Sequence, residues 1–241
     1  MAAIMRERAE KADLASLRAQ LERVQGRKLD APVLPVHPVL SELLPGGGLM
    51  PGGVYSLSGA TSLLFGLLAR PSQDGSWCGV IGMPEVGIEA AERLGVELER
   101  LVLVPEPGKR WIAVAATLAE VLPVVAVRPL SRAGNAEISR LSARLRDRGG
   151  VMLVQGPWPQ AEATLAVSDA RWEGLGKGHG YLATRTLTVT SSSKRWPVPR
   201  RRTMMLPNLD GTIVSAPETA TVSSWHDRAR DMAPAPIRAV G

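Results

Sequence analysis

Short apolar segments alternate with amphipathic segments through the middle of the chain. The apolar segments are VYSLS (54–58), CGVIG (78–82), LVLV (101–104), VVAV (124–127) and VMLV (151–154). Between them lie segments whose apolar residues recur at helical spacing, at 62–70, 85–95, 110–122 and 135–149. Unbroken apolar strands that alternate with amphipathic helices are typical of a mostly parallel sheet covered by helices on both faces. The pattern therefore predicts an α/β fold.

The pattern changes after Trp158, where the chain shows period-two alternation and no further helical spacing. Strands are predicted at 164–168, 183–192, 203–206 and 212–214, with a turn at GLGKGHG (174–180). Alternating strands separated by turn residues are typical of antiparallel pairing. We therefore predict antiparallel strands added to one edge of the parallel sheet.

The two ends of the chain differ from this core. In the N-terminal segment Leu14, Leu17, Leu21 and Val24 recur at the spacing of an amphipathic helix, which is expected to end at Gly26 before a proline-rich stretch. Such a helix could pack on its own domain or on another chain. The last stretch has few apolar residues apart from Trp225, an isolated aromatic that is a candidate anchor for a partner. We expect an N-terminal helix (1–30), an α/β core (31–215) and a flexible tail (216–241).

Composition and charge limit the class of protein. Apolar residues make up 45% of the chain and charged residues 22%, which is incompatible with disorder of the whole chain. A single Cys78 excludes an intrachain disulfide, and the charged N-terminus lacks an apolar signal segment. The longest uncharged window, 43–69, holds seven glycines and two prolines, so it does not predict a spanning helix. We expect a cytoplasmic protein that does not contact a membrane.

Two basic clusters are candidates for contact with nucleic acid or an acidic partner, since the net charge is +6. The first is on the predicted helix 135–149, with Asn135 as its N-cap and Gly149 at its end. Its residues Arg140, Arg144 and Arg148 share one face, which is either a solvated surface or a binding strip. The second is the run KRWPVPRRR, which is either a solvated hairpin loop or a weak DNA contact. Its candidate residues are Lys194, Arg195, Trp196, Arg200, Arg201 and Arg202.

The chain has the framework of a nucleotide site but lacks its reactive residues. A strand, a glycine-bearing turn and a helix (54–69) stand where a phosphate-binding loop belongs, yet no Lys or Arg occurs between Lys28 and Arg70. The strand 124–127 should end in a carboxylate that holds magnesium, but it is followed by Arg128. We therefore predict that no cation reaches a bound phosphate, that no nucleotide or other cofactor is used, and that the protein is not an enzyme.

Other catalytic and metal chemistry finds no support in the sequence. The residues His37, His179 and His226 are scattered, and with one cysteine they give no metal-ligand spacing. No Ser, His and Asp set is indicated.

Three segments carry a resemblance to a known family. ADLASLRAQLERVQGRK (12–28) is similar to the RecA N-terminal helix, and LPGGGLMPGGVYSLSG (44–59) to the segment that leads into its phosphate-binding loop. SWCGVIGMPEVGIEAAERLGVELERLVLVPEPG (76–108) is similar to the strand, helix and LGV turn that follow. The chain thus resembles the RecA-like family over about 12–215. Because the nucleotide motifs are missing, it most resembles the ImuA group, in particular the shortened actinobacterial form called ImuA-prime.

This resemblance implies a RecA-like fold and a role in the SOS response to DNA damage. The implied function is that of a non-catalytic accessory factor in mutagenic translesion synthesis. It would work with an inactive Y-family polymerase homologue (ImuB) and an error-prone replicative-type DNA polymerase. In RecA the N-terminal helix packs on the neighbouring protomer, which implies that the apolar stripe of this chain contacts either a second copy or the polymerase-like partner.

The sequence also departs from RecA. Glu85 lies nearest to the catalytic glutamate of RecA, but the gapless register puts Met83 there, so the role is not transferred. The stretches at the DNA-binding loops, 129–135 and 156–163, are short, so filament formation on DNA is not expected. A second reading is a RecA-fold inhibitor of cell division that binds the tubulin-like division protein, as the SulA relatives do, because these also lack a phosphate-binding loop.

Overall fold

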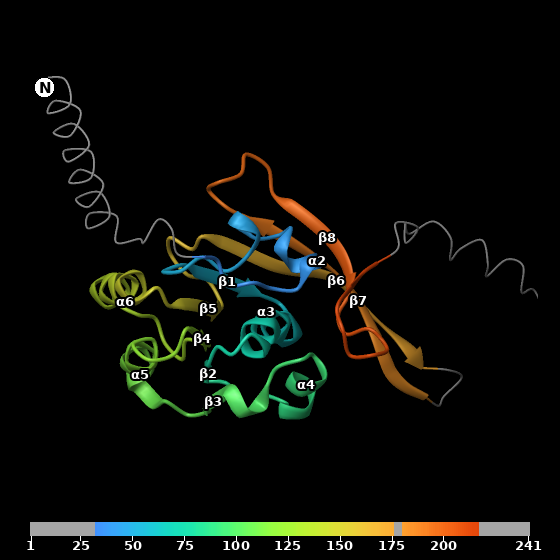
Figure 1. Ribbon diagram of the computed structural model, residues 1–241, viewed down its shortest axis with the longest axis horizontal. Helices are drawn as coiled ribbons and strands as arrows, with labels where there is room; N and C mark the ends of the chain where they lie inside the picture. The colour runs from blue at the N-terminus through green and yellow to red at the C-terminus, as the bar shows by residue number, and fades with distance from the viewer. Residues whose placement is uncertain (1–31, 176–179, 217–241) are drawn as a thin grey trace, which may run out of the picture.

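The protein folds into a single sheet with helices on both faces, as seen in a computed structural model that describes residues 32–175 and 180–216 (Figure 1). Within this part of the chain the strand order is β3-β2-β4-β5-β1-β6-β7-β8-β9. The predicted N-terminal helix, the centre of the turn at 174–180 and nearly all of the predicted tail lie outside the described residues.

The first half of the sheet is parallel. Its strands are β1 (Val54–Ser58), β2 (Cys78–Ile81), β3 (Leu101–Val104), β4 (Val124–Val127) and β5 (Val151–Gln155). The next strand, β6 (Ala163–Leu175), also runs parallel to β1. Strands β7 (Gly180–Ser192), β8 (Arg200–Met205) and β9 (Val214–Ser215) then pair antiparallel. The predicted parallel sheet with antiparallel strands at one edge is confirmed.

Helices cover the two faces of the parallel strands. On one face lie α2 (Pro38–Ser41), α3 (Thr61–Gln73) and α4 (Ile88–Arg93), and on the other α5 (Trp111–Leu118) and α6 (Asn135–Arg148). Short 3₁₀ turns lie at Pro45–Gly47, Leu98–Arg100 and Gly108–Arg110.

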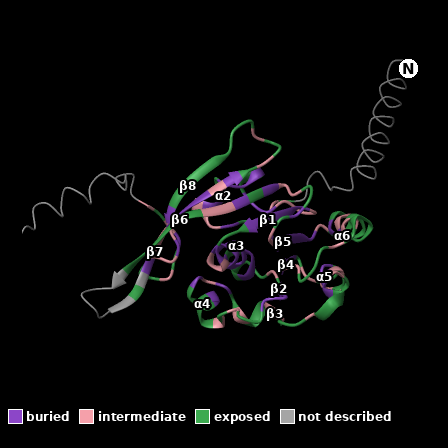
Figure 2. Ribbon diagram, turned by 180° about the vertical axis from the view of Figure 1, so that it is seen from behind, coloured by how far each residue is buried: buried purple, intermediate pink, exposed green. Residues whose placement is uncertain are grey.

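The sequence of strand β4 is wholly apolar because both faces of the strand are buried. Val124 and Ala126 pack in the cluster that contains α3, whereas Val125 and Val127 pack in the cluster that contains α5 and α6. Successive side chains of a strand point to opposite faces, so a strand covered on both faces has no polar position. Figure 2 shows buried residues along the central strands and exposed residues on the outward sides of the helices.

The helix boundaries required some correction. The helices predicted at 85–95 and 110–122 are shorter, because α4 is Ile88–Arg93 and α5 is Trp111–Leu118. The N-cap of α6 is Gly134 rather than the predicted Asn135, since the Glu137 carboxylate accepts a hydrogen bond from the Gly134 N–H at 2.9 Å. Gly149 ends α6 in the left-handed conformation at φ 71°, as predicted.

The hairpin formed by β6 and β7 is longer than the sequence predicted. Each strand has 13 residues, and the hairpin projects beyond the rest of the sheet (Figure 1). The period-two pattern ends at Ser168 because the strand register shifts between Ser168 and Arg171, which breaks the alternation. Beyond the shift Trp172 pairs with Arg185 across the two strands. Among the described residues, no helix has the length and apolar character that a membrane crossing requires.

Candidate functional site

The carboxyl ends of β1, β2, β4 and β5 meet at one edge of the sheet, where open α/β sheets bind their ligands. Strand β1 is followed by Gly59, whose φ is 113° and whose position leaves no room for a side chain. A Cβ at Gly59 would lie 2.8 Å from the Val167 Cβ, so this tight turn requires glycine. The turn leads directly into α3, which starts at Thr61 with no side-chain cap.

The start of α3 cannot act as a phosphate-binding loop of the usual kind. Where the gapless register would require glycine, lysine and a hydroxyl residue, the chain has Leu64, Phe65 and Gly66, all buried in the core. A Cβ on Gly66 would lie 2.8 Å from the Ile213 side chain, so this face of the helix is closely packed. Leu64, Phe65 and Gly66 therefore contribute to the core and supply no polar side chain to a ligand.

Arg128 stands at the end of β4, where a magnesium-holding carboxylate would be expected. Its Nε and Nη2 both donate to the Gln155 Oε1, at 3.0 and 2.7 Å, and its Nη1 donates to Glu85. The Gln155 Nε2 in turn donates to the Thr61 Oγ1 at 3.3 Å. This carboxyl-edge network, Glu85–Arg128–Gln155–Thr61, joins the ends of β2, β4 and β5 to the start of α3.

The electrostatics of the network oppose a metal ion. A guanidinium repels a divalent cation, and the nearest carboxylate, Glu85, is already engaged by Arg128. The pKa of Glu85 lies below its ordinary value, because its carboxylate accepts a hydrogen bond from its own backbone and one from Arg128. Within the described ranges, no group of three or more His, Cys, Asp or Glu residues could hold a metal ion.

A cavity of about 1010 Å³ lies beside this network. It is bounded by the start of α3, by α4, by the β6–β7 hairpin and by the loop 207–211. Arg185 of β7 lines it, and the Arg185 Nη1 lies 3.4 Å from the Ser62 Oγ at the start of α3. An arginine distant in sequence thus reaches the start of α3 from the antiparallel part of the sheet, although no Lys or Arg occurs between Lys28 and Arg70.

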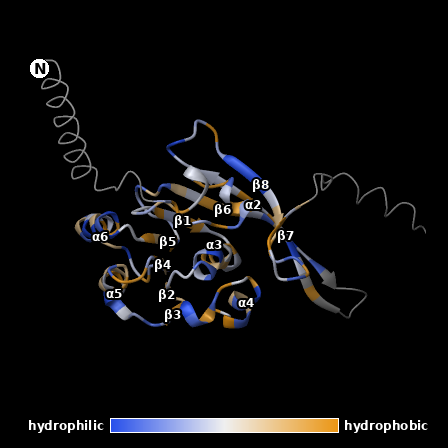
Figure 3. Ribbon diagram, viewed as in Figure 1, coloured by the Kyte–Doolittle hydropathy of each residue, from blue (hydrophilic) through white to orange (hydrophobic). Residues whose placement is uncertain are grey.

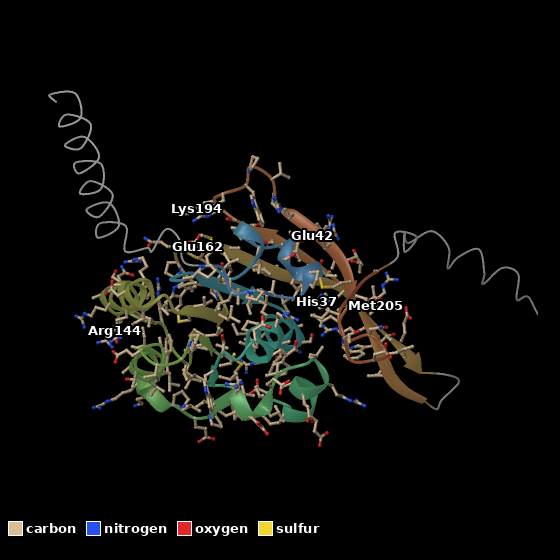
Figure 4. The ribbon with its side chains drawn as sticks, viewed as in Figure 1. His37, Glu42, Arg144, Glu162, Lys194 and Met205 are labelled. Atoms are coloured by element: carbon tan, nitrogen blue, oxygen red, sulfur yellow. The ribbon has the colours of Figure 1, made fainter. Side chains whose placement is uncertain are left out.

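The predicted arginine face of α6 is exposed. Arg140, Arg144 and Arg148 all lie on the outward side of the helix, where hydrophilic residues are evident in Figure 3. Arg144 forms an ion pair with Glu120 at 3.0 Å, so part of its charge is compensated locally. Figure 4 shows Arg144 well apart from Lys194, so the two basic clusters do not form one compact patch.

The basic run 194–202 does not form one continuous surface strip, because its first part lies in a loop and its last part in a strand. Residues 193–199 form the loop that the sequence predicted, but Arg200, Arg201 and Arg202 belong to β8. Because strand residues alternate between faces, Arg202 pairs with Glu42 while Arg201 pairs with Asp169 at 2.9 Å.

The loop itself holds further internal contacts. Arg195 pairs with Glu162 at 3.2 Å, and the Arg200 guanidinium lies 4.1 Å from the centre of the Trp196 ring. Trp196 is thus stacked on an arginine of its own chain. Lys194 is exposed at the loop (Figure 4). The candidate residues Leu14, Leu17, Leu21, Val24 and Trp225 lie outside the described residues.

Comparisons with known proteins place the chain in a family. Residues 42–160 match the family described as the MT3502 N-terminal domain, a range that contains α3 to α6 and β1 to β5. The chain is 34% identical over 139 residues to the uncharacterized protein Rv3395c of Mycobacterium tuberculosis. That alignment covers 55% of this chain and 67% of the relative. The chain belongs to the family of this mycobacterial protein.

The sequence analysis missed two members of the site. Gln155 gives no signal in the sequence, because an amide at a strand end is neither a magnesium-binding carboxylate nor a phosphate-binding lysine. Arg185 had a readable signal, since it stands in the same phase of β7 as the fully buried Leu187 and Val189. A charged residue in the buried phase of a strand is unfavourable unless it has a partner or a function.

Proposed function

We propose that this protein is a non-catalytic adaptor with a RecA-like fold that acts in damage-induced, error-prone translesion DNA synthesis. The role is supported by the similarity of 12–28, 44–59 and 76–108 to RecA segments and by the resemblance to the ImuA group. The proposed partners are an inactive Y-family polymerase homologue (ImuB-like) and an error-prone replicative-type DNA polymerase, and the proposed site of self-association is the N-terminal helix. The proposed location is the cytoplasm.

The observation that carries the non-catalytic part of this proposal is the pairing of Arg128 with Glu85. In a RecA-like nucleotidase the end of the fourth strand would supply a carboxylate for magnesium. Here a guanidinium occupies that position and binds both the nearest glutamate and Gln155. Since phosphoryl transfer depends on positioning and on charge compensation by a metal ion, a site closed by this ion pair lacks the means for it.

The adaptor role is tested by co-purification. The full chain carrying an affinity tag is recovered from cells treated with a DNA-damaging agent, and the bound proteins are probed for the mutagenic polymerases and for the tubulin-like division protein. We expect the polymerases and not the division protein. Recovery of the division protein alone would contradict the proposal and favour a SulA-like role.

The non-catalytic character is tested separately by titrating the purified protein with a fluorescent ATP analogue and magnesium. We expect neither magnesium-dependent binding in the micromolar range nor hydrolysis. Magnesium-dependent binding in that range would refute the assignment of Arg128 as the group that excludes the metal.

A further inference from the structure

Backbone contacts fix two of the segments that line the cavity beside α3. Arg185 exchanges two backbone hydrogen bonds with the next strand end, because its N–H donates to the Pro207 carbonyl at 2.9 Å and its carbonyl accepts from the Leu206 N–H at 2.7 Å. The loop 207–211 then closes on α4, where a Cβ at Gly211 would lie only 2.4 Å from the Arg93 carbonyl oxygen. Backbone contacts therefore join the elements that wall the cavity, which favours a preorganised binding site.

Arg185 is placed in this wall with unused binding capacity. Its guanidinium carbon lies 5.5 Å from the centre of the Trp172 ring, and its Nη1 makes a long hydrogen bond of 3.4 Å to Ser62. Its Nε is buried and finds no hydrogen-bond partner among the described residues. Burial lowers the pKa of the guanidinium from its ordinary value. The guanidinium is therefore only partly satisfied within the chain, which favours a ligand that accepts hydrogen bonds from it.

The charges around the cavity select the kind of anion. Arg93, Glu85 and Asp210 line it together with Arg185, so two cations face two carboxylates, and the cavity lacks the excess of positive charge that a polyphosphate or a nucleic-acid backbone favours. A single carboxylate matches the planar fork of one arginine and carries less charge than a polyphosphate, so it suffers less repulsion.

The rim of the cavity favours a protein segment. Trp172, Leu182 and Leu209 are 47%, 51% and 74% exposed, although each is a large apolar residue. An arginine stacked on an exposed tryptophan and flanked by leucines has the composition of a protein-binding hot spot. Trp172 and Leu182 belong to the β6–β7 hairpin, which projects beyond the rest of the sheet (Figure 1).

We propose that this cavity is the docking site for a partner-protein segment that presents a carboxylate beside apolar side chains. Arg185 binds the carboxylate through its guanidinium, and the apolar side chains pack on Trp172, Leu182 and Leu209. The inference rests on the proposed adaptor role, which requires binding to another protein, and it names the surface and the chemistry of that contact.

The test uses the full chain and two pools of short peptides. One pool combines Asp or Glu with Leu or Phe, and the matched pool has Asn or Gln in place of the acids. Binding is followed by the ¹⁵N–¹H signal of the Arg185 Nε, assigned by its loss in Arg185→Met. We expect the acidic pool to shift this signal and the matched pool to leave it unchanged. Arg185→Met should weaken binding of the acidic pool by about tenfold or more.

Arg171→Met is the matched control, because it removes the same charge from the exposed neighbour of Trp172 and should leave binding unchanged. The Tm of Arg185→Met is a second readout. A structural role of Arg185 predicts a lower Tm for this variant, whereas a binding role does not. We expect an unchanged or higher Tm, since a desolvated cation is removed; a marked fall would assign Arg185 to stability and overturn the proposal.

Equal binding of both pools, or binding of neither, would also overturn the proposal. A shift of the Arg185 signal by inorganic phosphate or single-stranded DNA in preference to the acidic pool would assign the site to phosphate instead. The assay involves no polymerase and no DNA damage. The two proposals can therefore fail separately. If the chain binds the acidic pool but has no role in mutagenesis, the adaptor function is refuted and the docking site is supported.

Discussion

Replacing Arg128 by methionine tests whether the carboxyl-edge network is structural. The change keeps much of the length of the side chain and removes both bonds to the Gln155 Oε1 as well as the pair with Glu85. A hydrogen bond to a charged group contributes about 1.5–3 kcal/mol. Because water can reach part of the Arg128 side chain, we expect a loss of about 1–2 kcal/mol in the free energy of unfolding, or about 2–8 °C in Tm.

The assay is chemical denaturation of the full chain, arranged as a double-mutant cycle with Gln155→Met. The two side chains are in contact, so their effects should not add, and we expect a coupling energy of about 1 kcal/mol. Arg132→Met is the control, since this exposed arginine lies in the loop after the same strand and its replacement should change stability by less than about 0.5 kcal/mol. Additive effects in the cycle, or equal effects of Arg128→Met and Arg132→Met, would refute the network.

Four further predictions concern other parts of the molecule. Gly82→Ala should cost more than about 1 kcal/mol in denaturant unfolding, because φ at this position is 75° and the new Cβ would lie 2.6 Å from a main-chain carbonyl oxygen at the end of β4; wild-type stability would contradict the close approach. The Cys78 thiol should resist a thiol reagent in the native protein at neutral pH, since burial raises its pKa to about 12 and only the thiolate reacts; rapid labelling of folded protein would show the thiol to be accessible. Replacing Arg200–Arg202 by alanine should weaken any DNA binding at low salt and flatten its salt dependence, because phosphate contacts release counterions; unchanged affinity would remove this run from the contact. Replacing Leu17 and Leu21 together by Asp should abolish association while the core stays folded, as size exclusion would report; earlier melting of a monomer with unchanged partner binding would assign the helix to its own core.

The sequence was sufficient for the elements whose patterning is local. Unbroken apolar runs such as VVAV identify strands buried on both faces, and Gly149 marks a helix end because it adopts a positive φ. The length of the β6–β7 hairpin was not predictable in this way, since the register shift after Ser168 disrupts the alternation.

The site depended on contacts between residues far apart in the chain. The absence of a lysine before α3 could be read directly, but the arrival of Arg185 beside Ser62 follows from the pairing of β7 in the sheet. The same holds for the bond between Arg128 and Gln155, which requires β4 and β5 to be neighbours. The sequence near a strand end shows which expected residues are missing there. The residues that take their place are brought by strand pairing and cannot be identified from the same stretch of sequence.

The most direct test of the adaptor function is the frequency of damage-induced mutation in cells of the source organism. A strain that lacks the protein is compared with a strain that carries the wild-type chain, after a sublethal dose of a DNA-damaging agent. We predict a clear fall in induced mutation without the protein, restored by the wild-type chain, and no change in cell division. An unchanged mutation frequency accompanied by altered division after damage would contradict the account.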